Sequence, residues 1–137
     1  MMMASAIQTE SKVKTHTPEG MQDIQIIEQI IIDYFDGLYE GDIDKLDRIF
    51  HDDVVLKAPN LRRGKSDWLK AVASRPVPQK EGAEYRFKLL AIEVIGDQAM
   101  VKLECPLFEK FYIDFIGLLK EHEHWLIVSK MYCDLAQ

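Results

Sequence analysis

The feature that most constrains the fold is the C-terminal part of the chain, where four long segments follow one another with only short breaks. They are rich in β-branched and aromatic residues and cover residues 85–95, 99–107, 111–121 and 124–133. Gly96-Asp97 and His122-Glu123 occupy the places of two-residue hairpin turns. The pattern predicts a four-stranded antiparallel meander.

Helical patterns are confined to the first half of the chain. Thr17-Pro18 resembles a helix start, with Thr as N-cap and Pro at the first helical position, and apolar residues then recur every three or four positions as far as Leu38. Asp42 and Ser66 can cap two shorter helices. A short strand or hairpin is expected around the Pro59-Asn60 turn. Helices that precede strands predict an α+β fold.

Length and composition fit one domain with one core, because 47% of the 137 residues are hydrophobic. We assign residues 1–17 to a flexible N-terminal tail and residues 18–137 to a single domain. The net charge of -6 argues against a nucleic-acid binder, and no segment has the roughly 18 apolar residues of a membrane span. Cys105 and Cys133 lack CxxC spacing, which favours reduced thiols in a cytoplasmic protein.

A two-residue turn at His122-Glu123 sets a register for the last hairpin and places Phe115 opposite Lys130. We expect the face that carries Phe115 to meet the helices. Asp114 would then lie on the outer face, which is apolar enough to predict a homodimer contact through that face. A β-bulge would change these assignments and could bring Asp114 and Lys130 to one face.

Four stretches carry a family resemblance: YFDGLYEGDIDKLDRIFHDDVVL, DWLKAVASRPVP, YIDFIGLLK and HWLIVSKMY. In order and spacing they resemble the "putative lumazine-binding" group of the nuclear transport factor 2-like (SnoaL-like) superfamily, which also contains polyketide cyclases and ketosteroid isomerases. The resemblance runs from about Ile24 to Tyr132. It implies a cone-shaped α+β fold, three helices packed on a strongly curved, mainly antiparallel sheet, with a pocket between the long helix and the sheet. It also implies a homodimer packed sheet to sheet.

Asp114 is the first candidate for a functional residue, because a carboxylate within an apolar strand must be paired, solvated or shifted in pKa. In the ketosteroid isomerases that the chain resembles, a pocket carboxylate and a phenol carry out proton transfer, which implies catalytic roles for Asp114 with Tyr34 or Tyr132. A structural ion pair is the alternative. Lys130 interrupts its strand in the same way and is a candidate partner for Asp114 or an anchor for an anionic ligand.

The residues expected to contact a ligand are aromatic, aliphatic or cationic side chains of the helices and the last two strands: Tyr34, Phe35, Leu38, Trp68, Phe115, Lys130 and Tyr132. Trp68 is favoured because a helix position over a sheet opening often lines a pocket. His51-Asp52-Asp53 and His122-Glu123-His124 contain metal-ligand residue types, but no third group stands at a suggestive spacing. We predict neither a metal nor a cofactor.

Three functions remain open from the sequence. The first is a small-molecule-binding domain with a mostly apolar pocket for an unknown small apolar or planar ligand. The second is a cofactor-independent isomerase, cyclase or dehydratase that uses Asp114 as a base, and the third is a dimeric interaction module without a ligand. A cavity of about 300 Å³ or more with a buried ionisable group would favour the first two. Two groups with opposed pKa shifts near one ligand atom would favour the enzyme.

Overall fold

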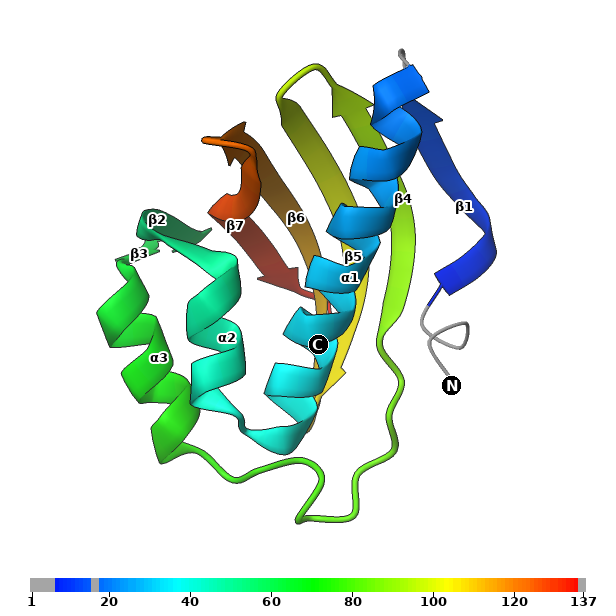
Figure 1. The fold of residues 1–137 in the computed structure, drawn as a ribbon. Coiled ribbons are helices and arrows are strands. Elements are labelled where there is room, and N and C mark those ends of the chain that lie inside the picture. Colours follow the sequence, from blue (N-terminus) through cyan, green and yellow to red (C-terminus); the bar gives the residue numbers. More distant parts are fainter. Residues whose placement is uncertain (1–6, 16–17, 136–137) are drawn as a thin grey trace.

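The structure is a computed structural model that describes residues 7–15 and 18–135, with the backbone alone described for residues 7–15, 18 and 19. In chain order its elements are β1 (Ile7–Thr15), α1 (Pro18–Glu40), α2 (Ile43–Ile49), β2 (Phe50–Ala58), β3 (Leu61–Arg63), α3 (Lys65–Ser74), β4 (Lys88–Ile95), β5 (Gln98–Leu107), β6 (Lys110–Glu121) and β7 (His124–Asp134). The long helix α1 crosses one face of a curved sheet, with α2 and α3 beside it next to β2 (Figure 1). This architecture confirms the predicted α+β class.

The strands of the described chain form one sheet in the order β1-β4-β5-β6-β7-β2-β3. Strands β4 to β7 are the predicted antiparallel meander, with two-residue turns at Gly96-Asp97 and His122-Glu123. Both residues of the second turn have positive φ, 52° and 64°, as a type I′ hairpin turn requires. The parallel pairing of β2 with β7, which extends the meander toward β3, was not predicted from the sequence.

The N-terminal segment is not wholly the flexible tail that the sequence analysis assigns to it. Residues 7–15 form β1, which pairs in parallel with β4 at one end of the sheet. In the sequence of this segment, Ile, Thr, Ser, Val and Thr alternate with charged or amide residues, which is a strand pattern of period two. Residues 1–6, 16 and 17 of the predicted tail lie outside the described residues.

Local sequence signals fix where the helices begin and end. Gly41, with a φ of 67°, follows α1, and Asp42 caps α2 by accepting a hydrogen bond from the backbone nitrogen of Lys45 at 3.1 Å. The N-cap of α3 is Gly64 rather than the predicted Ser66. None of the helices within the described ranges is long and apolar enough to cross a membrane.

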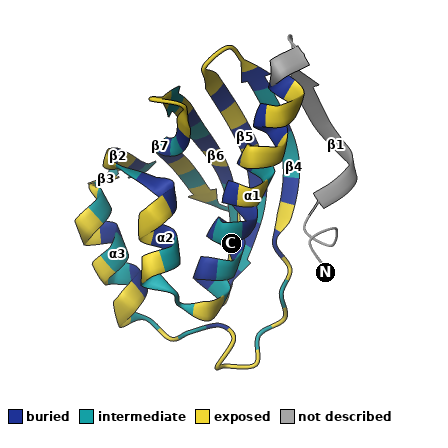
Figure 2. Cartoon of the chain, viewed as in Figure 1, coloured by how far each residue is buried: buried dark blue, intermediate teal, exposed yellow. Residues whose placement is uncertain are grey.

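The core lies between the helices and the inner face of the sheet, where the buried residues gather (Figure 2). On β6 the inner face carries Asp114 and Ile116, which are buried, whereas Phe115 and Leu119 on the outer face are 44% and 37% exposed. The predicted face assignment for this strand is therefore wrong. Both faces of β6 carry apolar residues, so the apolar pattern alone did not identify the face that packs against the helices.

A β-bulge in β7 accounts for the remaining error in register. Pairing is regular from the turn to Leu118 and Ile127, and Val128 is then an extra residue without a partner in β6. Beyond Val128 the pairing is shifted by one residue, which turns Lys130 to the inner face. The bulge therefore brings Lys130 to the same face as Asp114, as the bulged alternative predicted.

Candidate functional site

A cavity of about 160 Å³ lies between α1, α3 and the inner face of strands β5 to β7. Its floor is formed by buried side chains: Tyr34, Leu38, Trp68, Cys105, Leu107, Asp114 and Lys130. Its rim is formed by partly exposed side chains: Arg63, Arg75, Tyr112 and Tyr132. Charged groups are thus present at both depths of the cavity, which is more polar than the mostly apolar pocket predicted from the sequence.

The carboxyl group of Asp114 lies at the floor and has one free oxygen. The Tyr34 hydroxyl donates a hydrogen bond to Asp114 Oδ2 at 2.8 Å. Asp114 is only 1% exposed, and its Oδ1 has no hydrogen-bond partner among the described residues. A buried polar atom without a partner is costly to a folded protein, so this oxygen is a strong candidate for ligand contact.

The ammonium group of Lys130 lies among aromatic rings on the same face. Its Nζ is 4.5 Å from the ring centre of Trp68, 4.8 Å from that of Tyr132 and 5.2 Å from that of Tyr34. These distances are within the range of cation–π attraction. The side chain is buried and forms no hydrogen bond or ion pair with any residue in the described part of the chain.

Burial pushes the two charged groups at the floor toward their neutral forms. It raises the pKa of Asp114, against the opposing effects of the Lys130 charge and of the Tyr34 hydrogen bond. It lowers the pKa of Lys130, against the opposing effect of the Asp114 carboxylate. Two ionisable groups with opposed pKa shifts therefore line one cavity.

Asp114 and Lys130 are diagonal neighbours across the strand pair, because Asp114 lies opposite Tyr132. Diagonal positions are about 7–8 Å apart, a distance that a long side chain such as that of lysine can span. No ion pair joins them in the described structure, so the predicted bridge between Asp114 and Lys130 is wrong. Their interaction is electrostatic and acts across the floor of the cavity.

The other ionisable groups at the floor are held neutral. Burial, followed by the Asp114 charge, raises the pKa of Tyr34 well above its usual value. Burial also raises the pKa of the Cys105 thiol, which disfavours the thiolate and hence a nucleophilic role. At the rim, burial lowers the pKa of Arg75, but a guanidinium remains charged in proteins.

The structure brings five of the seven predicted ligand contacts to this cavity: Tyr34, Leu38, Trp68, Lys130 and Tyr132. Phe35 is fully buried but stacks on Phe87, with ring centres 5.2 Å apart, and does not line the cavity. Phe115 lies on the outer face of the sheet, so its predicted contact with a pocket ligand is wrong.

Five lining residues were not predicted from the sequence: Arg63, Arg75, Cys105, Leu107 and Tyr112. The two arginines had a visible signal, because Arg63 belongs to the only dense basic run and Arg75 precedes the segment with two prolines that ends α3. Neither signal pointed to a shared site, and only the fold shows that both arginines line the same cavity.

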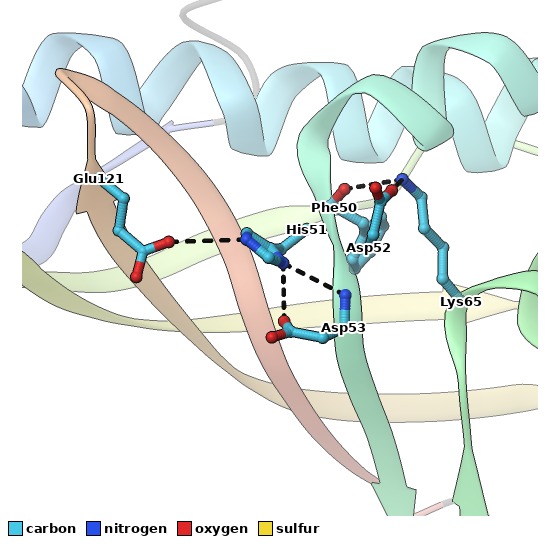
Figure 3. A network of polar contacts seen from close by, with 6 residues as sticks. All are labelled: Phe50, His51, Asp52, Asp53, Lys65 and Glu121. Carbon is cyan, nitrogen blue, oxygen red and sulfur yellow. Dashed lines mark hydrogen bonds and ion pairs between the residues drawn. The ribbon is translucent and has the colours of Figure 1, made fainter.

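A polar network lies away from the cavity, where β2 begins (Figure 3). Lys65 Nζ is 2.9 Å from the carbonyl oxygen of Phe50 and 3.1 Å from Asp52 Oδ1. His51 lies between two carboxylates, with Nδ1 2.7 Å from Asp53 Oδ1 and Nε2 3.5 Å from Glu121 Oε1. The network ties the starts of α3 and β2 to the end of β6. Within the described ranges, no group of three or more His, Cys, Asp or Glu residues could hold a metal ion.

A curved sheet that carries a cavity beneath a long helix defines the class to which this chain belongs. A family model with the description "Putative lumazine-binding" matches residues 22–133. This match covers most of the chain, and the chain is therefore a member of that family. The resemblance noted in the sequence is confirmed. A search of curated proteins finds no match.

Solved structures show that the fold is nuclear transport factor 2-like. A protein of unknown function from Shewanella baltica aligns with a TM-score of 0.76 and 18% identity over 89% of this chain and 99% of that one. A second protein of unknown function, from Silicibacter pomeroyi, aligns with a TM-score of 0.71 and 20% identity over 84% of this chain and 98% of that one. A ketosteroid isomerase-like protein from Erwinia carotovora atroseptica aligns with a TM-score of 0.65 and 19% identity over 82% of this chain and 96% of that one. At these identities the likeness concerns the fold alone.

Proposed function

We propose that this chain is a small-molecule-binding domain whose ligand occupies the cavity between α1, α3 and the sheet. The observation that carries the proposal is the floor of the cavity, where Asp114 Oδ1 and Lys130 Nζ are both without a polar partner among the described residues. A domain without a ligand would be expected to fill this space with apolar side chains or to pair these groups. The family description supports the same class of function.

The size of the cavity limits the ligand to a compact molecule. Its volume of about 160 Å³ is below the roughly 300 Å³ of common ligand pockets, so the size criterion set from the sequence is not met and the proposal depends on the buried ionisable groups. An apolar cavity of about 150 Å³ can enclose benzene. One six-membered ring therefore fits, with its substituents near the polar floor and rim. A bicyclic compound such as lumazine would project beyond the rim.

NMR titration of the full chain tests this proposal through its two tryptophans. The indole N–H of Trp68 should shift on addition of 4-hydroxybenzoate or lumazine, because Trp68 lines the cavity. The indole of Trp125 serves as an internal control, since it donates to Asp23 at 3.0 Å and does not line the cavity. Cys105→Leu should fill the floor and remove the shift, whereas Cys133→Leu, at an exposed position, should retain it. A saturable shift that survives Cys105→Leu would place the ligand elsewhere and contradict the proposal.

The opposed pKa shifts of Asp114 and Lys130 favour a second candidate function, cofactor-independent proton transfer. Asp114 in its carboxylate form would remove a proton from the carbon next to a carbonyl, and Lys130 would stabilise the enolate oxygen. If the substrate has a carbon–carbon double bond one position further along, the product of this step is a dienolate. The same proton would then be added to the γ carbon of the dienolate, so that the double bond becomes conjugated with the carbonyl group. Tyr34 would position Asp114 through its hydrogen bond.

A single-ring substrate suits the small cavity, so we expect conversion of 3-cyclohexenone to 2-cyclohexenone, followed by ultraviolet absorbance. Asp114→Asn should lower the rate by about a hundredfold or more, because it removes the base. Asp53→Asn, at an exposed site, should leave the rate unchanged. Equal rates for wild type and Asp114→Asn would reject the enzyme and leave ligand binding untouched.

The outer face of the sheet supports the homodimer. Apolar side chains that are between 37% and 49% exposed cross neighbouring strands of this face: Val55, Met100, Phe115, Leu119 and Met131. Contact with a second copy would remove this apolar row from water. The contact face was predicted on β6 and β7 alone, with Met131 among its residues, whereas Val55 and Met100 extend the observed row to β2 and β5.

Light scattering should give about twice the 15.9 kDa mass of the chain for the wild type and the monomer mass for Phe115→Glu. Phe108→Glu is the matched control, because Phe108 is 43% exposed, close to the 44% of Phe115, but lies in the turn between β5 and β6. A wild-type mass equal to that of one chain would refute the dimer.

A further inference from the structure

The cavity contains an imbalance of charge that the proposed function does not use. Three cationic side chains, those of Arg63, Arg75 and Lys130, line it with a single carboxyl group, that of Asp114. The chain as a whole carries the opposite excess, with 23 acidic and 17 basic residues. Positive charge is thus concentrated around this cavity in a protein that is acidic as a whole.

These three cations also differ from the paired cations of the molecule. On the surface, Lys45, Lys65, Lys110 and Lys120 each have a carboxylate within 4.0 Å. In the described structure, no carboxylate or hydrogen-bond acceptor contacts the side chains of Arg63, Arg75 or Lys130. The carboxylate of Asp114 acts on Lys130 across the floor, so one anion offsets the mutual repulsion of three cations only in part.

The burial of the lining residues orders these groups by depth. Lys130 and the free oxygen of Asp114 are at the buried floor, and Arg63 and Arg75 are at the partly exposed rim. Trp68 and Tyr132 supply ring surface between them. Planar guanidinium groups match carboxylate geometry and can donate two parallel hydrogen bonds.

We propose that the ligand of this cavity is a small planar acid, a single-ring or similarly compact carboxylate. The carboxylate lies at the rim against Arg63 and Arg75, and a hydroxyl or carbonyl oxygen at the opposite end reaches the floor between Asp114 and Lys130. The proposal rests on the proposed function, because it names the chemical class of ligand for the same site.

The test compares 4-hydroxybenzoate with its neutral analogue 4-hydroxybenzamide, in titrations of the full chain followed by calorimetry and by the Trp68 indole resonance. The two compounds have nearly the same shape and differ in charge at the end that would meet the arginines. Hydrogen bonds between charged groups contribute more than neutral ones, so the acid should bind at least about tenfold more tightly.

Three arginine variants locate the charge that is recognised. Arg63→Gln and Arg75→Gln should each weaken 4-hydroxybenzoate binding by about tenfold and leave the weak binding of the amide nearly unchanged. Arg62→Gln is the matched control, because Arg62 is the exposed neighbour on β3 and donates to the carbonyl oxygens of Ala58 and Leu61 rather than lining the cavity. It removes the same net charge and should retain full affinity. If Arg75→Gln is unfolded by circular dichroism, Arg63→Gln provides the test.

The outcomes separate this inference from the proposed function. If the amide shifts the Trp68 resonance and binds as tightly as the acid, or if Arg62→Gln weakens the acid as much as Arg63→Gln, the cavity binds ligands but the class is not anionic, and the inference is overturned. If neither compound nor lumazine shifts the Trp68 resonance, the inference and the proposed function both fail. Preference for the acid that depends on Arg63 and not on Arg62 supports both.

Discussion

The double variant Asp114→Asn/Lys130→Met is expected to be more stable than the wild type, by about 1–4 kcal/mol in the free energy of unfolding at pH 7. Both charges are buried and are not in direct contact, so neither regains in the folded protein the hydration that it has in the unfolded chain. Neutral residues of similar size avoid this cost, and the amide oxygen of the introduced asparagine can still accept the hydrogen bond from Tyr34. The same variant should lose affinity for the ligand, because function and stability place opposite demands on the floor of the cavity.

The size of this gain should depend on pH in a way that follows from the pKa directions. Asp114 has a raised pKa when folded, so wild-type stability falls as pH rises from its ordinary value of 3.8 through the folded pKa. Lys130 has a lowered pKa when folded, so wild-type stability recovers as pH rises from that lowered value toward 10.5. The double variant lacks both groups. The gain in stability of the double variant over the wild type should therefore be largest at a pH between the folded-state pKa values of Asp114 and Lys130, and smaller at lower or higher pH.

Urea unfolding across this pH range measures the effect. The control is Glu40→Gln/Lys45→Met, which neutralises a surface pair with a separation of 3.3 Å and should change stability by less than about 1 kcal/mol at any pH. A double variant at the floor that is less stable than the wild type at pH 7 would show that Asp114 and Lys130 form a net stabilising pair, contrary to the structure.

Trp68→Ala is expected to destabilise the protein by about 3–5 kcal/mol, because it removes a large side chain that is 4% exposed. The indole ring lies 5.0 Å from Phe50 and 6.4 Å from Tyr34, measured between ring centres, and 4.5 Å from Lys130 Nζ. Its loss joins the space it occupied to the existing cavity and removes the closest ring from the Lys130 ammonium group. Equilibrium unfolding in urea gives the free energy directly.

Trp68→Phe separates packing from the loss of the ring, because phenylalanine keeps an aromatic surface beside Phe50 and Lys130. It should cost about 1–3 kcal/mol, clearly less than Trp68→Ala. An alanine variant that loses less than about 1 kcal/mol would mean that α3 does not close over the cavity as the structure has it.

Much of the fold could be predicted from the sequence because it depends on local chemistry. Asp42 caps a helix wherever its side chain can reach the first free N–H groups, and Gly96 permits a turn with positive φ regardless of what surrounds it. The bulge at Val128 has no comparable signal. Its position follows from how β7 pairs with β6 and packs beneath the helices, which a periodic pattern does not contain.

The part of the candidate site that could be predicted consists of charged residues within apolar strands, where a charge is rare. Asp114 and Lys130 each interrupt an apolar strand, and this identified them without the structure. Arg63 and Arg75 stand among polar residues, where a cation is common, and only the tertiary arrangement distinguishes them from Arg62. The face that carries Phe115 was assigned wrongly because an apolar residue of a strand packs equally well against a helix or against another subunit.

The extra residue in β7 has a consequence for how this strand can vary in length. Because Val128 is unpaired, its deletion would leave a simple alternation in which Trp125, Ile127, Lys130 and Tyr132 all still point inward. Loss of Met131 instead would turn Tyr132 outward. β7 can therefore gain or lose a residue at Val128 while Trp125 and Ile127 stay buried near the hairpin and Lys130 and Tyr132 still line the cavity.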